Sequence, residues 1–162
     1  MHDCIFCKIV KGEIPSKKVY EDGDVLVFLD INPASKGHVL VTAKKHYENI
    51  YDVDEEILKK MIVVSKKMAD KIKKAFDADG INIVQNNGQH AGQLVNHIHF
   101  HVIPRYPEDK VIITYQRQQM SEHQMNEIVN ILKEEAVKHV KEKEERDFAP
   151  KRFHHDDEEW EL

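Results

Sequence analysis

The sequence of 162 residues predicts an α+β protein with a mainly antiparallel sheet. Short segments rich in Val, Ile, Leu and Phe, separated by Gly, Asn and Pro, predict three strands in the first third of the chain. A long stretch with apolar residues at every third or fourth position predicts one central helix. Two more strand segments and a last helical stretch follow, so strands do not alternate regularly with helices as they do in a parallel sheet.

The N-terminal part is expected to contain a short helix or turn and a hairpin. Residues 3–11 have near-helical apolar spacing, and Pro15 ends that segment. The predicted strands of this part are 19–21, 25–30 and 38–42. The first two flank Asp22-Gly23-Asp24, which is typical of a hairpin turn, and residues 32–37 read as a loop.

The central helix is predicted at residues 54–79, with many lysines between its apolar positions. Those lysines are most simply a solvated face. Asp52 followed by Glu55 resembles a capping box at the helix start. Gly80 is a natural residue to follow the helix end.

The C-terminal part is expected to complete the sheet and add a second helix. Strands are predicted at 80–85 and 95–103, separated by a Gly- and Asn-bearing loop at 86–92, with a short edge strand at 111–115. Ser121, with Gln124 three residues later, begins a helix that runs to about residue 143. We expect residues 1–110 to form the core domain, 111–145 a helical extension, and 146–162 an acidic tail that is either disordered or packed on a partner subunit.

Charge and hydropathy exclude several classes of protein. The formal net charge is −5, so the chain is not expected to bind nucleic acid polymers. Nine acidic and five basic residues lie in 141–162, so most of this charge belongs to the tail. The longest purely apolar run, residues 25–29, is too short to span a membrane, and residues 1–30 lack a secretory apolar segment. We therefore expect a cytoplasmic protein.

Cysteines and histidines are the residues that point to chemistry. The two cysteines, Cys4 and Cys7, exclude a disulfide-rich scaffold and leave a redox pair, half of a metal site, or two plain thiols. Eleven histidines are present, and six of them lie between His38 and His101. Metal storage or redox sensing is a further hypothesis for the function, and only the numbers of cysteines and histidines support it.

Three histidines alternate along the strand predicted at 95–103. Side chains of a strand point to opposite faces in turn, so Ile98, Phe100 and Val102 face the core. The opposite face then carries His97, His99 and His101. Such a face suits either a metal or an imidazole that acts as nucleophile and general acid or base. The polar loop before the strand favours catalysis by imidazole, because its amide groups can donate hydrogen bonds to phosphate oxygens.

These residues resemble a known family. The run His97-Ile98-His99-Phe100-His101-Val102-Ile103 resembles the signature of the histidine triad (HIT) proteins. Further matches in the family order are Phe6, Asp30-Ile31-x-Pro33, Gly37-His38-x-Leu40-Val41, Lys45-His46, Asn86 and Gly92-Gln93. The chain looks like the bacterial branch related to purine nucleoside phosphoramidases, and Pro104-Arg105 is similar to the dinucleoside polyphosphate hydrolases. The resemblance implies a HIT-like fold in a homodimer whose sheet continues across the interface.

The resemblance also implies a mechanism and its residues. His99 would attack the α-phosphorus of a nucleoside phosphate derivative, and water would then release a nucleoside monophosphate from the nucleotidyl-histidine, with no metal required. His101 would contact the phosphate and the bridging atom, and His38 would orient the triad. The implied nucleotide-binding residues are Asp30 for the ribose, Asn86 and Gln93 for the phosphate, and Phe6, Phe28 and Ile31 for the nucleoside, a purine.

Two further points follow from the resemblance. Cys4, Cys7, His46 and His97 match the ligands of a structural zinc ion in similar proteins. Leu94 stands where phosphoramidases of the family have a serine that helps to protonate the leaving amine, which puts efficient phosphoramidase chemistry in doubt. The alternatives are a dinucleoside polyphosphate hydrolase and a nucleotide-binding regulatory protein with incidental catalysis.

Overall fold

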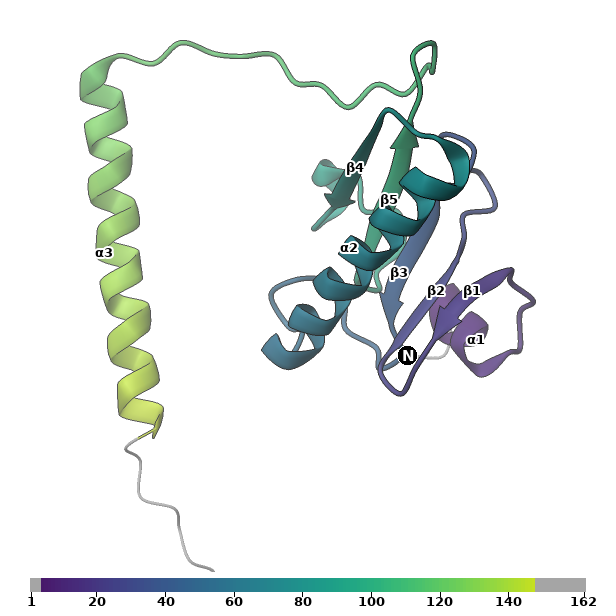
Figure 1. Cartoon of the computed structure of the whole chain (residues 1–162). Helices are drawn as coiled ribbons and strands as arrows, with labels where there is room; N and C mark the ends of the chain where they lie inside the picture. The colour runs from purple at the N-terminus through teal and green to yellow at the C-terminus, as the bar shows by residue number, and fades with distance from the viewer. Residues whose placement is uncertain (1–3, 148–162) are drawn as a thin grey trace, which may run out of the picture. The chain divides into compact units, whose positions relative to one another are not determined.

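The computed structural model describes residues 4–147 of the chain (Figure 1). The chain divides into two compact units, Met1–Ile113 and Thr114–Leu162, which are described separately below. Most of the predicted acidic tail, from residue 148 onward, lies outside the described residues.

The first unit is built on one antiparallel sheet of five strands. They are β1 (Lys18–Glu21), β2 (Val25–Leu29), β3 (Val39–Ala43), β4 (Gly80–Gln85) and β5 (His99–Arg105). Their spatial order is β1-β2-β3-β5-β4, and every neighbouring pair is antiparallel. The predicted α+β class with an antiparallel sheet is therefore confirmed.

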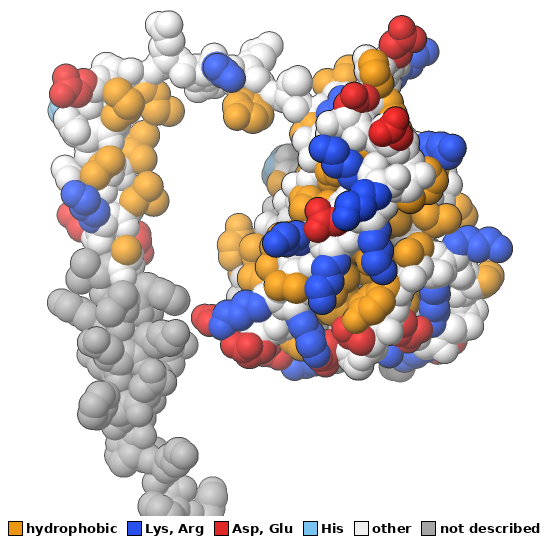
Figure 2. Space-filling view, in the orientation of Figure 1, with side chains coloured by type: hydrophobic (Ala, Val, Ile, Leu, Met, Phe, Trp, Pro, Cys, Tyr) orange, Lys and Arg blue, Asp and Glu red, His pale blue; other side chains and the backbone are white. Residues whose placement is uncertain are grey.

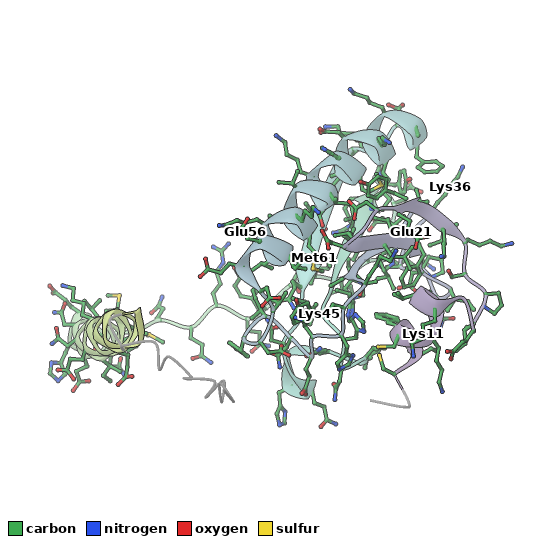
Figure 3. The ribbon with its side chains drawn as sticks, turned by 90° about the horizontal axis from the view of Figure 1, so that it is seen from below. Lys11, Glu21, Lys36, Lys45, Glu56 and Met61 are labelled. Carbon is green, nitrogen blue, oxygen red and sulfur yellow. The ribbon has the colours of Figure 1, made fainter. Side chains whose placement is uncertain are left out.

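Helix α2 (Glu55–Phe76) covers one face of the sheet and forms the main core with it. Met61 lies fully buried between α2 and the strands (Figure 3). The same core contains alternate residues of three strands, which are Val25, Val27, Val39, Val41, Phe100 and Val102. The outer side of α2 carries exposed lysines, seen as a blue band along the helix in Figure 2. This division into an apolar and a basic side confirms the helical periodicity of the sequence.

The opposite face of the sheet packs against helix α1 (Ile5–Lys11). Phe6 and Ile9 of α1 form a second cluster with Leu26, Phe28 and Leu40. These strand residues alternate with those that face α2, so β2 is buried on both faces.

The predicted start of the central helix is confirmed to within one residue, but both predicted caps are wrong and the helix ends earlier, at Phe76. The carboxylate of Asp52 accepts hydrogen bonds from the backbone N–H groups of Glu48 and Asn49, both at 2.9 Å, and takes no part in capping. Asp54 precedes the helix without a side-chain capping bond, and its carboxylate pairs with side chains of the preceding loop. At the other end Asp77 adopts the left-handed conformation (φ 52°), and Gly80 is the first residue of β4.

The edge strand predicted at 111–115 is also wrong. The backbone N–H of Val111 donates to the carboxylate of Asp109 (3.1 Å), and its carbonyl accepts from Arg105 (2.8 Å). These groups close a turn after β5 and are not available to a strand. The strand predicted at 95–103 begins only at His99, because the N–H groups of His97 and Ile98 bond to Val95 and to Tyr47.

The second unit contains helix α3 (Glu122–Asp147), whose predicted start is confirmed. The backbone N–H of Gln124 donates to the Ser121 hydroxyl (3.3 Å), and the N–H of Ser121 donates to the Gln124 side chain (2.9 Å). This reciprocal pair is a capping box. No helix among the described residues is long and apolar enough to cross a membrane.

Candidate active site and metal centre

His99 is the central residue of the site, at the start of β5. Its side chain is buried, and Nδ1 lies 2.7 Å from the backbone carbonyl oxygen of His97. A carbonyl only accepts, so Nδ1 carries the proton of the neutral ring. Nε2 of His99 therefore keeps an unprotonated lone pair, as a nucleophile requires.

His38 and His101 form a chain of hydrogen bonds beside it. The backbone N–H of Ala34 donates to Nδ1 of His38 (3.1 Å), so the His38 proton lies on Nε2. That Nε2–H donates to Nδ1 of His101 (3.0 Å), which leaves the His101 proton on its own Nε2. The rings of His99 and His101 are 4.9 Å apart between centroids. The structure thus pairs a lone pair on His99 with an N–H donor on His101.

Burial keeps these rings neutral. It lowers the pKa of His101 to about 4, and the neighbouring His99 and His38 add to the effect. Burial also lowers the pKa of His99 and of His38, while the Asp30 carboxylate acts in the opposite direction on both. All three imidazoles are therefore uncharged near pH 7.

Asp30 follows β2 and borders this chain of histidines. One carboxylate oxygen accepts the backbone N–H of Asn32 (2.9 Å), and the other lies 3.7 Å from Nδ1 of His38. The side chain is 17% exposed. The carboxylate is thus fixed in direction and reachable from solvent.

The three apolar residues predicted for the nucleoside pocket lie in different environments. Phe6 and Phe28 are buried and in contact, with ring centroids 5.4 Å apart. Phe6 also touches the His99 ring at 5.1 Å. Ile31 is 92% exposed, so in this structure it stands apart from the other two. Leu94 is 93% exposed.

The polar loop before β5 is held by Gln93, which is buried. Its amide nitrogen donates to the carbonyls of Glu48 (2.6 Å) and Val95 (3.1 Å), and its oxygen accepts from the N–H of Gly88 (2.7 Å). Both hydrogens of the Gln93 side-chain amide are therefore bonded within the protein, and in this structure Gln93 stabilises the conformation of the loop. Asn86 reaches only the carbonyl of Gly92, at 3.5 Å, and keeps an amide hydrogen available.

The structure brings Cys4, Cys7, His46 and His97 together beside the strand that carries His99 and His101. Nδ1 of His97 lies 3.3 Å from the sulfur of Cys4 and 3.5 Å from that of Cys7. Nδ1 of His46 lies 3.3 Å from the Cys7 sulfur and 3.3 Å from Nδ1 of His97. His97 is fully buried, and its Nε2–H donates to the carbonyl of Ala43 (2.8 Å), so its Nδ1 has no proton.

These four groups fit a tetrahedral zinc ion. In a tetrahedron, bonds of about 2.0 Å to nitrogen and about 2.3 Å to sulfur place two nitrogens about 3.3 Å apart, a nitrogen and a sulfur about 3.5 Å apart, and two sulfurs about 3.8 Å apart. Burial and the neighbouring Cys4 raise the pKa of the Cys7 thiol, and a cation bound at its sulfur would favour the thiolate. Four protein ligands leave no open position, which is the arrangement of a structural site.

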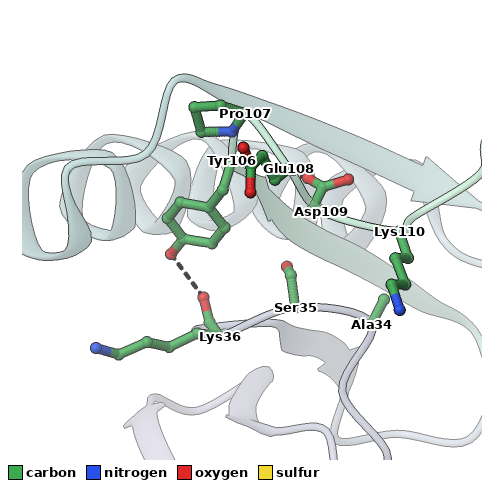
Figure 4. Close-up of a pocket in the computed structure, with 8 residues that line it drawn as sticks. All are labelled: Ala34, Ser35, Lys36, Tyr106, Pro107, Glu108, Asp109 and Lys110. Atoms are coloured by element: carbon green, nitrogen blue, oxygen red, sulfur yellow. Dashed lines mark hydrogen bonds between the residues drawn. The ribbon is translucent and has the colours of Figure 1, made fainter.

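An open groove of about 630 Å³ lies beside these sites, between residues 34–36 and 106–110 (Figure 4). No histidine lines it. The Tyr106 hydroxyl donates to the carbonyl of Lys36 (2.8 Å), and the Ser35 hydroxyl donates to that of Pro104 (2.5 Å). These bonds hold the segment whose Ala34 N–H orients His38. The residues that line the groove therefore help to hold His38 in position.

The comparisons with known proteins identify the family. The HIT domain model matches residues 11–108. The chain belongs to the histidine triad family. An uncharacterised HIT-like protein of Methanocaldococcus jannaschii is 48% identical over 138 residues, which are 85% of this chain and 98% of that one. A Saccharomyces cerevisiae protein named adenosine 5′-monophosphoramidase is 43% identical over 110 residues, 68% of this chain and 67% of that one.

Solved structures of HIT proteins have the same fold. The SMU.412c protein of Streptococcus mutans matches with a TM-score of 0.80 and 41% identity, over 84% of this chain and 87% of that one. A zinc-bound HIT protein of Mycobacterium smegmatis matches with a TM-score of 0.65 and 38% identity, over 75% of this chain and 87% of that one. The predicted HIT family and fold are thus confirmed.

The resemblance to the family implies a backbone carbonyl that accepts from the His99 ring and fixes its tautomer, and the His97 carbonyl is that group. Sequence reasoning missed two other backbone groups of the site: the Ala34 N–H donates to His38, and the Ala43 carbonyl accepts from His97. Any residue type supplies these groups, so no side-chain pattern in the sequence reveals them.

Proposed function

We propose that this HIT protein hydrolyses nucleoside phosphate derivatives at the α-phosphorus through a nucleotidyl intermediate on His99. The observation that carries the proposal is the pairing of an unprotonated Nε2 on His99 with an N–H on His101. A relative named as an adenosine 5′-monophosphoramidase supports the same chemistry.

The chemical steps follow from these protonation states. Nε2 of His99 forms a bond to the α-phosphorus while the bond from phosphorus to the leaving group breaks. The Nε2–H of His101 gives its proton to the leaving atom. The His97 carbonyl holds the Nδ1 proton of His99, which stabilises the positive charge that develops on the ring. Water then attacks phosphorus while the bond from phosphorus to Nε2 of His99 breaks. One water proton replaces the proton that His101 gave up, and a nucleoside monophosphate leaves.

Substrate binding is proposed at the neighbouring residues. The Asp30 carboxylate accepts from the ribose hydroxyls, and the Asn86 amide donates to the phosphate. Phe6, Phe28 and Ile31 contact a purine base, with Ile31 closing over it from its exposed position. Gln93 acts by holding the phosphate loop in shape.

Other properties belong to the same proposal. Cys4, Cys7, His46 and His97 hold a structural zinc ion, which the zinc-bound M. smegmatis protein supports. The protein works in the cytoplasm as a homodimer in which the outer strand β4 continues the sheet into a second subunit.

Replacing the nucleophile tests the mechanism. We expect His99→Asn to lower nucleoside monophosphate release by a factor on the order of 10³ or more, because no other group supplies the attacking lone pair. Binding of AMP should persist. The measurements are product release by chromatography and trapping of the wild-type adduct, located on His99 by mass spectrometry.

The matched control is His123→Asn, an exposed histidine of helix α3 in the second unit. This variant should keep wild-type turnover. Full activity in His99→Asn, or an adduct on another residue, would overturn the mechanism.

Leu94 favours a second candidate, hydrolysis of dinucleoside polyphosphates. Leucine offers no hydroxyl to protonate a leaving amine, whereas a phosphate leaving group needs less help from an acid. Assaying an adenosine phosphoramidate beside a diadenosine polyphosphate, with the same release of AMP as readout, separates the two activities.

A further inference from the structure

Phe6 lies between the two cysteines of the metal cluster. Cys4 is the N-cap of α1, and its sulfur accepts the backbone N–H of Cys7 at 3.4 Å. Phe6 occupies the turn that these two residues close, and its side chain is 6% exposed. The direction of the ring therefore depends on where the two sulfurs are held.

The ring of Phe6 packs against both functional histidines of the strand segment. Its plane stands at 84° to that of His99, with centroids 5.1 Å apart. It also meets His97 at 5.9 Å and 60°. Edge-to-face contacts of this kind have a preferred geometry. The carbonyl of His97 fixes Nδ1 of His99, and the Phe6 ring limits rotation of the imidazole about that hydrogen bond.

Helix α1 depends on contacts with the rest of the unit. It contains seven residues, too few to be stable by itself, and its buried residues, Phe6 and Ile9, pack against the sheet. The cluster joins its first turn to His46 after β3 and to His97 before β5. A metal in the cluster would therefore fix the first turn of α1, and Phe6 with it, against the catalytic strand.

Resting on the proposed function, we propose that Phe6 is a positioning residue for His99, held in place by the metal cluster of Cys4, Cys7, His46 and His97. The cluster then does more than stabilise the N-terminal segment. It keeps the nucleophile in one orientation, with Nε2 directed toward the phosphorus. This role is separate from the contact of Phe6 with the base, because a base contact governs binding and orientation of His99 governs kcat.

A pair of variants in the same helix tests the role of Phe6. Phe6→Leu keeps most of the apolar volume and loses the flat ring. Ile9→Ala removes more volume from the same cluster, and no ring contact joins Ile9 to His99. The readouts are kcat, KM, zinc content, and the ¹⁵N NMR shifts that report which His99 nitrogen carries the proton.

We expect Phe6→Leu to lower kcat about ten- to hundredfold with bound zinc retained, since small misplacement of a reacting group has effects of this size. Its His99 signals should show a mixture of ring states. Ile9→Ala should unfold more easily than Phe6→Leu yet keep kcat within about twofold and a wild-type His99 spectrum. Phe6→Leu with wild-type kcat and His99 signals would overturn the proposal, as would a change confined to KM.

Removing the metal from the full chain gives the second arm. After treatment with a chelator, the His99 signals should change in the way that Phe6→Leu changes them, and zinc should restore them. Unchanged signals in zinc-free protein would mean that the cluster does not hold Phe6. The NMR experiment observes the His99 imidazole directly, so its result is valid even if no nucleotide adduct forms. Absence of the adduct in wild-type protein would refute the proposed function and leave the positioning of His99 by Phe6 untouched.

Discussion

At the scale of single residues, His101 shows how hydrogen bonding assigns a role to one of several similar side chains. His38 donates to its Nδ1, so only its Nε2–H is available to a substrate. His99 instead donates from Nδ1 to a backbone carbonyl, so its Nε2 is unprotonated and is available as an acceptor. The donor and the proposed nucleophile thus differ in the group that each ring bonds through Nδ1.

We predict that His101 makes the protein less stable in acid. Burial and the facing His38 and His99 lower its pKa to about 4, against the weaker opposite effect of Asp30, whereas in the unfolded chain it titrates near 6.5. Between these values the unfolded chain binds a proton that the folded chain does not. The free energy of unfolding therefore falls as pH drops from about 6.5 to about 4, by up to about 1.4 kcal/mol per pH unit.

Urea unfolding at a series of pH values, for wild type and His101→Gln, measures this effect. The variant lacks the titrating group, so its stability should depend less steeply on pH in that window. The other buried histidines are common to both proteins, so the difference measures His101 together with its electrostatic effect on His38 and His99. Parallel profiles for the two proteins would show that His101 contributes nothing.

The sequence predicted the faces of the histidine strand better than the partners of the side chains on them. Alternation along the strand placed His99 and His101 on the face opposite Ile98, Phe100 and Val102, because a strand presents every second side chain on one face. Gln93 has an amide that suits a phosphate, yet the fold uses that amide on the carbonyls of Glu48 and Val95. Glu48 is far away in the sequence, and local pattern carries no information on such a contact.

At the scale of elements, interiors were easier to predict than ends. Helix α2 was recognised from the periodicity of its apolar residues, which reflects burial of one side, and strand β4 from its Val and Ile content, although β4 itself is only half-buried. The ends of helices and strands depend on which polar groups pair with one another. Asp52 has the right spacing for a helix cap, but its carboxylate accepts from the backbone N–H groups of Glu48 and Asn49 instead.

The connection between β2 and β3 contains a glycine whose replacement we expect to be costly. Gly37 has φ +94°, and a Cβ there would lie 2.9 Å from the Phe76 ring and 3.2 Å from Pro104. We predict that Gly37→Ala destabilises the fold by about 1–3 kcal/mol through backbone strain and overpacking. Chemical denaturation measures the change.

Gly23→Ala is the matched control, because its Cβ would meet nothing within 4 Å. Its stability should stay within about 0.5 kcal/mol of wild type, as for an ordinary surface substitution. Equal stabilities of the two variants would contradict the steric argument. The same connection carries Ala34 and His38, so Gly37→Ala should also slow turnover.

At the scale of the whole molecule, the site and the core belong to one unit. Both hydrophobic clusters, the metal cluster and the three histidines of the active site lie within Met1–Ile113. We predict that a chain ending at residue 113 folds cooperatively, with a melting temperature within a few degrees of the full chain, and retains its zinc. Circular dichroism and metal analysis test this.

Failure of the shortened chain to fold would show that Thr114–Leu162 supplies contacts that the first unit needs. In the full chain the apolar residues Ile128, Val129 and Leu132 of α3 are 41–64% exposed. The shortened chain should for that reason be at least as soluble as the full chain.

The strand order has a consequence for synthesis on the ribosome. β4 is made before β5, yet it lies at the outer edge of the sheet, and its one strand partner among the described residues is β5. While the chain emerges, β1, β2 and β3 can pair, but the uncharged segment GINIVQ has no strand to join until Arg105 has left the exit tunnel. The nascent chain thus exposes a segment prone to pair with other strands, and the insertion of the histidine strand both ends that exposure and assembles the catalytic groups.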